Sequence, residues 1–125
     1  MLKTIILVGS GGFIGSVARY FISKLNLHVY FFSIPVGTLI VNVLGSLIIG
    51  FLAGIADKSP LMTLELRLLL MAGFCGGFTT FSTFSNENLM LMQNGQYGIV
   101  FLYTGLSILL GFSAAFGGYT ASSLL

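Results

Sequence analysis

The chain has 125 residues, of which 56% are hydrophobic and only 6% are charged, and its mean hydropathy is +1.04. These values exclude an ordinary soluble domain and indicate a protein of the lipid bilayer. The net charge is only +2, and the scattered charges form no basic patch that would bind a nucleic acid. The single cysteine excludes an internal disulfide and a CxxC metal or redox site.

Four apolar runs are long enough to cross a membrane, which takes about 20 residues in a helix. They span residues 4–25, 35–56, 63–93 and 97–124. They predict an all-α membrane protein with four transmembrane helices, in which residues 1–125 form a single domain. The first run continues into Arg19 without a small-x-small cleavage site, so we expect a retained span and no signal peptide. Pro35 suits the first turn of the second helix, and Asn94-Gly95 ends the third.

The third run carries helix breakers near its centre and, at about 30 residues, is longer than a straight span needs. Gly76-Gly77 and Thr79-Thr80 combine low helix propensity with hydroxyls that compete for backbone hydrogen bonds. We therefore expect the third helix to be broken there. Unwound backbone at membrane depth is tolerated only where protein, water or an ion satisfies it, so a broken helix indicates an ion or substrate site.

Aromatic rings and hydroxyls follow the expected break. Phe81 and Phe84 share a helical face at i, i+3, and Ser82 and Ser85 form a parallel pair offset by one position. A phenyl ring edge carries the positive end of the ring's quadrupole, so two stacked rings attract an anion weakly. Conduction requires such weak binding, and the pattern favours an anion pore.

Three polar residues within the apolar runs each have more than one interpretation. Asn42 offers amide donors to a small anion, or it only joins two helices; beside the phenylalanine run we favour the pore. Arg19 raises the anion concentration in a vestibule, or its side chain snorkels to the membrane surface. Glu87, an intramembrane carboxylate one turn beyond Phe84, is a functional candidate that accepts a proton, repels wrong anions or marks the water boundary.

Small residues recur at helical spacing in the first two runs, where they allow close helix contact. They are Gly11, Gly15, Ser46, Gly50 and Gly54. Packing within the chain and packing between subunits are both open interpretations of these faces.

Basic residues barely select an orientation in the membrane. If the helices alternate in direction, Lys3, Lys58 and Arg67 lie on one side and Arg19 and Lys24 on the other. Two oppositely inserted copies would form a dimer whose two-fold axis lies in the membrane plane. The alternative is a single orientation, with Arg19 too deep to count.

No catalytic set is apparent in the sequence. His28, which we expect in a loop, has no nucleophile or metal partner near it, and HExxH motifs, Walker loops and paired acids are absent. The sequence therefore predicts a protein that is not an enzyme.

The run GFCGGFTTFSTFS at 73–85, with GTLIVN at 37–42 and GGFIGSVARY at 11–20, closely resembles the Fluc (CrcB) bacterial fluoride channels over the whole chain. The resemblance implies a fluoride-specific ion channel of the bacterial inner membrane that lets toxic cytoplasmic fluoride leave the cell. It also implies an antiparallel, dual-topology homodimer with two pores, each drawing on both subunits.

The same resemblance implies roles for particular residues. Phe81 and Phe84 match the pore-lining phenylalanines, and Asn42 matches the pore asparagine. The backbone carbonyls of Gly76 and Thr79 match positions that hold a structural Na⁺ at the dimer interface, and a hard cation prefers such oxygens. Looser matches to vestibule and polar-track positions are Arg19, Thr38, Ser82, Glu87, Tyr103 and Ser107.

Three other classes of membrane protein remain as alternatives. Small multidrug exporters share the four-span layout, but their coupling uses an acid in the first span, and this first span has none. A structural subunit of a larger complex would explain the glycines but not the Thr/Ser/Phe run. A cation channel would use acidic rings in place of phenylalanine edges.

Overall fold

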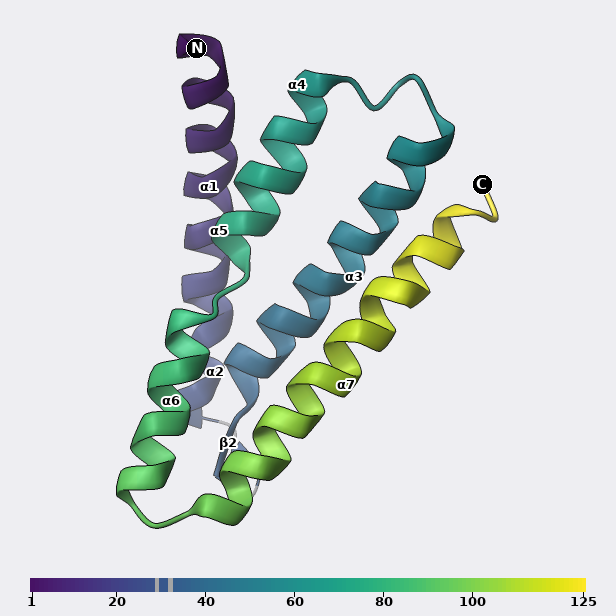
Figure 1. Cartoon of the computed structure of the whole chain (residues 1–125). Helices are drawn as coiled ribbons and strands as arrows, with labels where there is room; N and C mark the ends of the chain where they lie inside the picture. Colours follow the sequence, from purple (N-terminus) through teal and green to yellow (C-terminus); the bar gives the residue numbers. More distant parts are fainter. Residues whose placement is uncertain (29, 32) are drawn as a thin grey trace.

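Four long helical segments run side by side, each antiparallel to the segment before it (Figure 1). The computed structural model describes residues 1–28, 30, 31 and 33–125. Within these residues, four segments are long and apolar enough to cross a membrane, which confirms the predicted helical protein with four spans. The spans are α1 (Leu2–Ser23), α3 (Val36–Lys58), the composite third span Leu64–Gln93, and α7 (Tyr97–Ser122).

The third span consists of several helical pieces. They are α4 (Leu64–Leu66), the π-helix η1 (Arg67–Cys75), α5 (Gly76–Phe78) and α6 (Ser82–Gln93). The sequence did not predict the π-helix, because its apolar residues suit either helix type. Such wide turns occur often near functional sites.

The ends of the spans differ from the predicted bounds by at most a few residues. Pro35 does not lie in the first helical turn as predicted: its ψ of 90° is not helical, so it is the N-cap and Val36 begins α3. The end of the third span at Asn94-Gly95 is as predicted, since Asn94 is the C-cap and Gly95 has a φ of +76°. Only glycine adopts that conformation readily.

The connection between the first two spans contains structure that the all-α prediction missed. A short helix, α2 (Leu25–His28), is followed by strands β1 (Tyr30–Phe31) and β2 (Ile34–Pro35), which pair antiparallel. The prediction that His28 lies in a loop was therefore wrong, because His28 ends α2. Strands of two residues are too short to produce an alternating pattern in the sequence.

Glycines allow α1 to pack closely on the third span. A Cβ atom on Gly11 would collide with the Leu69 carbonyl oxygen, and one on Gly15 with that of Phe74. Both glycines are buried. This face of α1 is therefore used within the chain, which decides between the two interpretations of its small residues.

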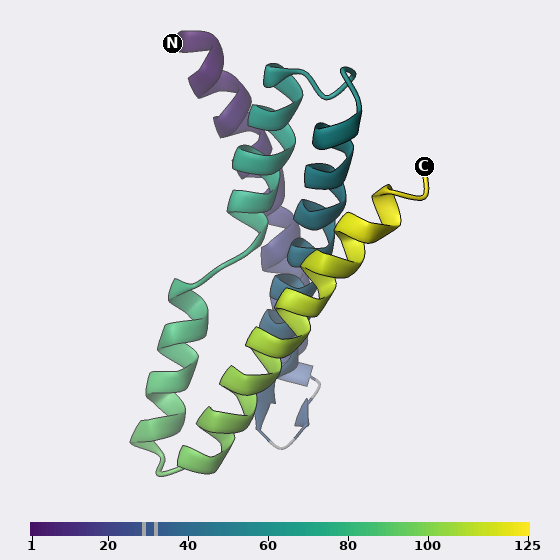
Figure 2. The same cartoon turned by 45° about the vertical axis from the view of Figure 1, so that its right-hand side comes forward.

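A second glycine-mediated contact joins α3 to α7, which lie side by side along most of their length (Figure 2). A Cβ atom on Gly50 would collide with the Ala115 carbonyl oxygen, and one on Gly54 with the Ser122 hydroxyl. From the other side, a Cβ on Gly118 would collide with the Leu47 carbonyl oxygen. The small face of α3 also packs within the chain.

Candidate functional site

The third span leaves helical geometry between α5 and α6, where Figure 1 shows an extended segment. We call this segment, residues 79–81, the link. Thr79 has φ −83° and ψ 158°, and α6 begins at Ser82. Gly76 and Gly77 are helical residues of α5, so these glycines do not themselves turn the chain. Gly77 instead allows α1 to approach, because a Cβ there would lie 2.5 Å from the Gly12 carbonyl oxygen.

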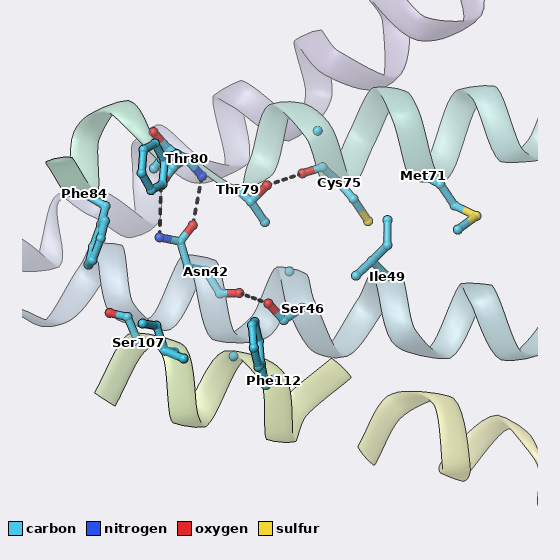
Figure 3. A pocket seen from close by; sticks show the side chains of 15 residues that line it. Asn42, Ser46, Ile49, Met71, Cys75, Thr79, Thr80, Phe84, Ser107 and Phe112 are labelled. Atoms are coloured by element: carbon cyan, nitrogen blue, oxygen red, sulfur yellow. Dashed lines mark hydrogen bonds between the residues drawn. The ribbon is translucent and has the colours of Figure 1, made fainter. Parts of the chain in front are cut away.

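Asn42, in the first third of α3, binds the backbone of this link. Its Nδ2 donates to the Thr80 carbonyl oxygen at 3.1 Å, and its Oδ1 accepts from the Thr80 N–H at 2.8 Å (Figure 3). One side chain therefore satisfies both backbone groups of a residue outside the helix, as an apolar surrounding requires. This contact joins α3 to the third span, which is one of the two interpretations that the sequence left open, and the amide also lines the groove described below.

Several backbone carbonyls lose their helical donors at the link, and those of Gly76 and Thr79 are among them. In an unbroken α-helix, the Thr80 N–H would bond to the Gly76 carbonyl and the Thr83 N–H to the Thr79 carbonyl. Here the Thr80 N–H donates to Asn42, and the Thr83 N–H donates to the Thr80 hydroxyl at 3.2 Å. Gly76 and Thr79 are the two residues that the family resemblance matched to a sodium site, and the Gly77 carbonyl, which also loses its helical donor, accepts from Arg19 instead.

The Gly76 and Thr79 carbonyls are chemically suited to a hard cation such as Na⁺, which takes neutral oxygen ligands. Gly76 is exposed, and the space beside its Cα is open to at least 4 Å. Among the described residues there is no cluster of His, Cys, Asp or Glu that would hold a metal in another way. Gly76 and Thr79 of one chain offer only part of a coordination shell.

Arg19 extends from α1 to the same link. Its Nε donates to the Gly77 carbonyl oxygen at 2.9 Å, and the residue is half-buried. The guanidinium therefore binds a carbonyl at the end of α5, a contact that neither sequence interpretation of Arg19 included. Arg19 and Asn42 thus bind neighbouring residues of the third span from two different helices, α1 and α3.

A groove of about 460 Å³ lies beside the link and is lined by residues of α3, the third span and α7 (Figure 3). None of its lining residues, all of them described, carries a charge. The polar groups that line it include Asn42, Ser46, Thr79, Thr80 and Ser107. The remainder of the lining is apolar or glycine.

Phe81 and Phe84 both line this groove, with their ring centroids 6.0 Å apart and the rings tilted by 42°. The structure thus brings together the two rings that the sequence placed on one helical face. Phe81 is 78% exposed, whereas Phe84 packs on the buried Tyr103 with ring centroids 5.0 Å apart. The Phe81 ring therefore projects from the chain, whereas the Phe84 ring packs within the chain.

Of the two serines in the predicted polar track, Ser107 lines the groove and Ser82 does not. The Ser107 hydroxyl is buried and has no hydrogen-bond partner among the described residues. Ser82 is exposed at the start of α6, with its hydroxyl 3.5 Å from that of Thr80. Ser107 thus lines the groove with a hydroxyl whose hydrogen-bonding capacity is unused among the described residues.

Thr38, Tyr103 and Glu87 gather one turn beyond Phe84, away from the groove lining. The Thr38 hydroxyl donates to Glu87 Oε2 at 2.7 Å, and the Tyr103 hydroxyl donates to Glu87 Oε1 at 2.8 Å. Both donors are buried, with 1% and 0% of their surfaces exposed. Three residues from α3, α6 and α7 thus form one cluster.

Asn26 of α2 is the cluster member that the sequence did not identify. Its Nδ2 donates to Glu87 Oε2 at 3.1 Å and to the Thr38 hydroxyl at 3.0 Å. An asparagine at the end of an apolar run is a common capping residue. That signal was present, but the sequence could not show that Asn26 caps a different helix and reaches a carboxylate 61 positions away.

Comparison with known proteins gave consistent matches over nearly the whole chain. Residues 6–119 match the model of the family described as CrcB-like protein, Camphor Resistance (CrcB). A protein of Azobacteroides pseudotrichonymphae genomovar. CFP2 is 44% identical over 95% of this chain and 95% of its own. One from Bacteroides fragilis is 47% identical over 94% and 95%, and one from Campylobacter jejuni is 46% identical over 95% and 97%. All three are named fluoride-specific ion channel FluC, which is the name of a channel and not of an enzyme.

Proposed function

The chain belongs to the CrcB family, and on this premise we propose that it is a fluoride-specific ion channel. In the proposal it lies in the bacterial inner membrane and lets cytoplasmic fluoride leave the cell passively, which lowers fluoride toxicity. The observation that carries the proposal is the groove beside the link in the third span. It combines phenyl rings with amide and hydroxyl donors and contains no charged side chain.

Such a lining suits the conduction of a small anion. The edges of Phe81 and Phe84 present the positive ends of two ring quadrupoles, and the Asn42 amide and Ser107 hydroxyl present hydrogen-bond donors. Each contact is weak compared with a lysine or arginine, so an anion that enters is able to leave. The same lining offers no oxygen-rich acidic ring for a cation.

We further propose that the channel is an antiparallel, dual-topology homodimer. The 78% exposure of Phe81 in a single chain supports this, because a phenylalanine that lines a closed pore needs a second surface to cover it. In the proposal two pores run through the dimer, and each draws on both subunits. The broken third span lies at the contact between the chains.

Within this dimer, the freed carbonyls of Gly76 and Thr79 from both chains would hold a structural Na⁺. The ion supplies a positive charge that satisfies carbonyls left without donors at membrane depth. Asn42 and Arg19 support the site, because they bind the backbone of the neighbouring Thr80 and Gly77. These contacts keep the link extended.

The remaining polar residues extend the proposed pathway beyond the groove. Ser82 and Ser107 provide hydroxyls near the two phenylalanines. Thr38, Tyr103 and Glu87 form the polar cluster at the far end of the path, next to Phe84. Arg19 contributes positive charge near the link, with its remaining N–H groups directed at no hydrogen-bond partner among the described residues.

Anion efflux from liposomes tests the proposed function. Purified protein is reconstituted in vesicles loaded with potassium fluoride or potassium chloride, and valinomycin is added while an ion-selective electrode records release. We expect rapid fluoride release and negligible chloride release. Equal release of both ions, or none from protein shown to be folded, would contradict the proposal.

A further inference from the structure

Asn26 uses the whole hydrogen-bonding capacity of its amide at the junction of three spans. Its Oδ1 accepts from the backbone N–H groups of Gly37 at 2.7 Å and Thr38 at 3.3 Å. Its Nδ2 donates both hydrogens, one to the Thr38 hydroxyl and one to Glu87 Oε2. An asparagine has two amide donors and one acceptor oxygen, so no group of this side chain remains unused.

The oxygen and the nitrogen of Asn26 have separable tasks. The oxygen caps α3, whose own N-cap residue, Pro35, makes no side-chain cap bond. Gly37 allows this approach, because a Cβ there would lie 2.9 Å from Asn26 Oδ1. The nitrogen contributes nothing to the cap and instead binds Thr38 and Glu87.

The nitrogen fixes the direction of the Thr38 hydroxyl as well as the carboxylate. Because Asn26 donates to Thr38 Oγ1, the hydroxyl hydrogen points toward Glu87 Oε2, 2.7 Å away. Tyr103 holds the other carboxylate oxygen at 2.8 Å. Among the described residues, Asn26, Thr38 and Tyr103 each donate a hydrogen bond to the Glu87 carboxylate oxygens.

Glu87 lies one turn beyond Phe84 on α6. Phe84 lines the groove and Glu87 does not, so the direction of the Glu87 side chain decides whether its charge reaches the groove. A carboxylate released from its donors would be free to turn toward that lining and repel an anion there. We infer that Asn26 is a positioning residue for conduction: its amide N–H keeps the Glu87 carboxylate on its Thr38 and Tyr103 donors, at the end of the proposed pathway, so that the carboxylate does not turn into the groove. The inference rests on the proposed fluoride channel function.

Asn26→Asp separates this role from capping. Aspartate is as good a cap as asparagine, so the bonds to Gly37 and Thr38 persist. However, a carboxylate oxygen then replaces the Nδ2 group that lies 3.1 Å from Glu87 Oε2, and the two like charges repel. We expect fluoride efflux from liposomes to fall about tenfold, a coupling within the usual range for contacting residues.

The double variant Asn26→Asp with Glu87→Gln exchanges the amide and the carboxylate. Positions 26 and 87 then again hold one carboxylate and one amide, but the carboxylate lies on α2 and the amide on α6. We expect efflux to recover to within about threefold of the original protein. Asn86→Asp serves as the control for added charge, because Asn86 is exposed on α6 and its amide contacts only Met90 Sδ, at 3.8 Å. Its efflux should be unchanged.

Unchanged efflux in Asn26→Asp would overturn the inference, as would a loss that Glu87→Gln does not rescue or an equal loss in Asn86→Asp. Melting temperatures provide a second measure. If Asn26→Asp does not fold, a double variant that folds and conducts supports the inference, and one that does not fold contradicts it. If the original protein carries no fluoride, the proposed function fails, while recovery of the melting temperature in the double variant still reports whether Asn26 holds Glu87.

Discussion

At the scale of single residues, the polar side chains of the site act first on the backbone of the third span. Asn42 satisfies Thr80, and Arg19 binds the carbonyl of Gly77. Only one Asn42 amide hydrogen is used by Thr80, so the other is available to an anion in the groove. The Asn42 side chain therefore binds the backbone of the link and also lines the groove.

Replacing Phe81 should separate pore lining from packing. Phe81→Ile removes the ring edge from the groove, and because Phe81 is 78% exposed, the substitution should leave the melting temperature of the chain nearly unchanged. We expect fluoride efflux to fall by about tenfold or more, since the ring supplies the weak anion contact. Phe116→Ile is the matched control, because Phe116 is 71% exposed on α7 and does not line the groove. Equal efflux in the two variants would show that the Phe81 ring has no part in conduction.

The sequence identified the residues that stand out locally but not their distant partners. Phe81 and Phe84 were placed together from i, i+3 spacing, and their rings lie 6.0 Å apart. Asn42 stood out as an amide in an apolar run. Its partner Thr80 lies 38 positions away, and the Asn26 to Glu87 contact joins residues 61 positions apart. Spacing along one helix contains no information about such contacts.

At the scale of elements, hydropathy located all four spans, because a helix that crosses the bilayer needs about 20 mostly apolar side chains in sequence. The β1–β2 pairing and the π-helix were missed, since neither has a pattern of its own in the composition. Gly76 and Gly77 were expected to break the third helix, but the structure has them in helical conformation. They lie within α5, and Thr79 is the residue with extended backbone.

The contact between α3 and α7 should depend on one of two adjacent glycines. A Cβ on Gly118 would collide with the Leu47 carbonyl oxygen, whereas Gly117 has nothing within 4 Å. Gly118→Ala should lower the melting temperature in detergent by about 5 °C or more, as overpacking does. Gly117→Ala should leave it unchanged or raise it, because alanine favours a helix by about 1 kcal/mol over glycine. Equal melting temperatures would show that α3 and α7 do not need this close approach.

At the scale of the whole molecule, the basic residues lie at opposite ends of the helices. Lys3 pairs with Glu65 at 3.2 Å, and Arg67 donates to the Ala56 carbonyl oxygen at 3.4 Å, so both lie where α1 begins and α3 ends. Arg19 lies toward the other end but is half-buried and bound to Gly77. We therefore expect Arg19 to influence the orientation of the chain in the membrane less than Lys24 does.

Changing a charge at either end should shift the orientation of the chain in opposite directions. In a dual-topology protein, Arg67→Asp should decrease the fraction of chains whose Arg67 end faces the cytoplasm. Lys24→Gln, at the opposite end, should increase the same fraction. The accessibility of a C-terminal tag in intact and opened cells measures both. One fixed orientation in the original chain and in both variants would contradict dual insertion.

The most direct test of the proposed channel is the zero-current potential across a planar bilayer that contains the protein, with fluoride on one side, chloride on the other and equal pH. A passive fluoride-specific pore predicts a steady current without a proton gradient and a potential displaced far toward the fluoride equilibrium value. A potential near zero would show that chloride passes equally well. A current that appears only when a proton gradient is imposed would identify a coupled exporter and contradict the channel.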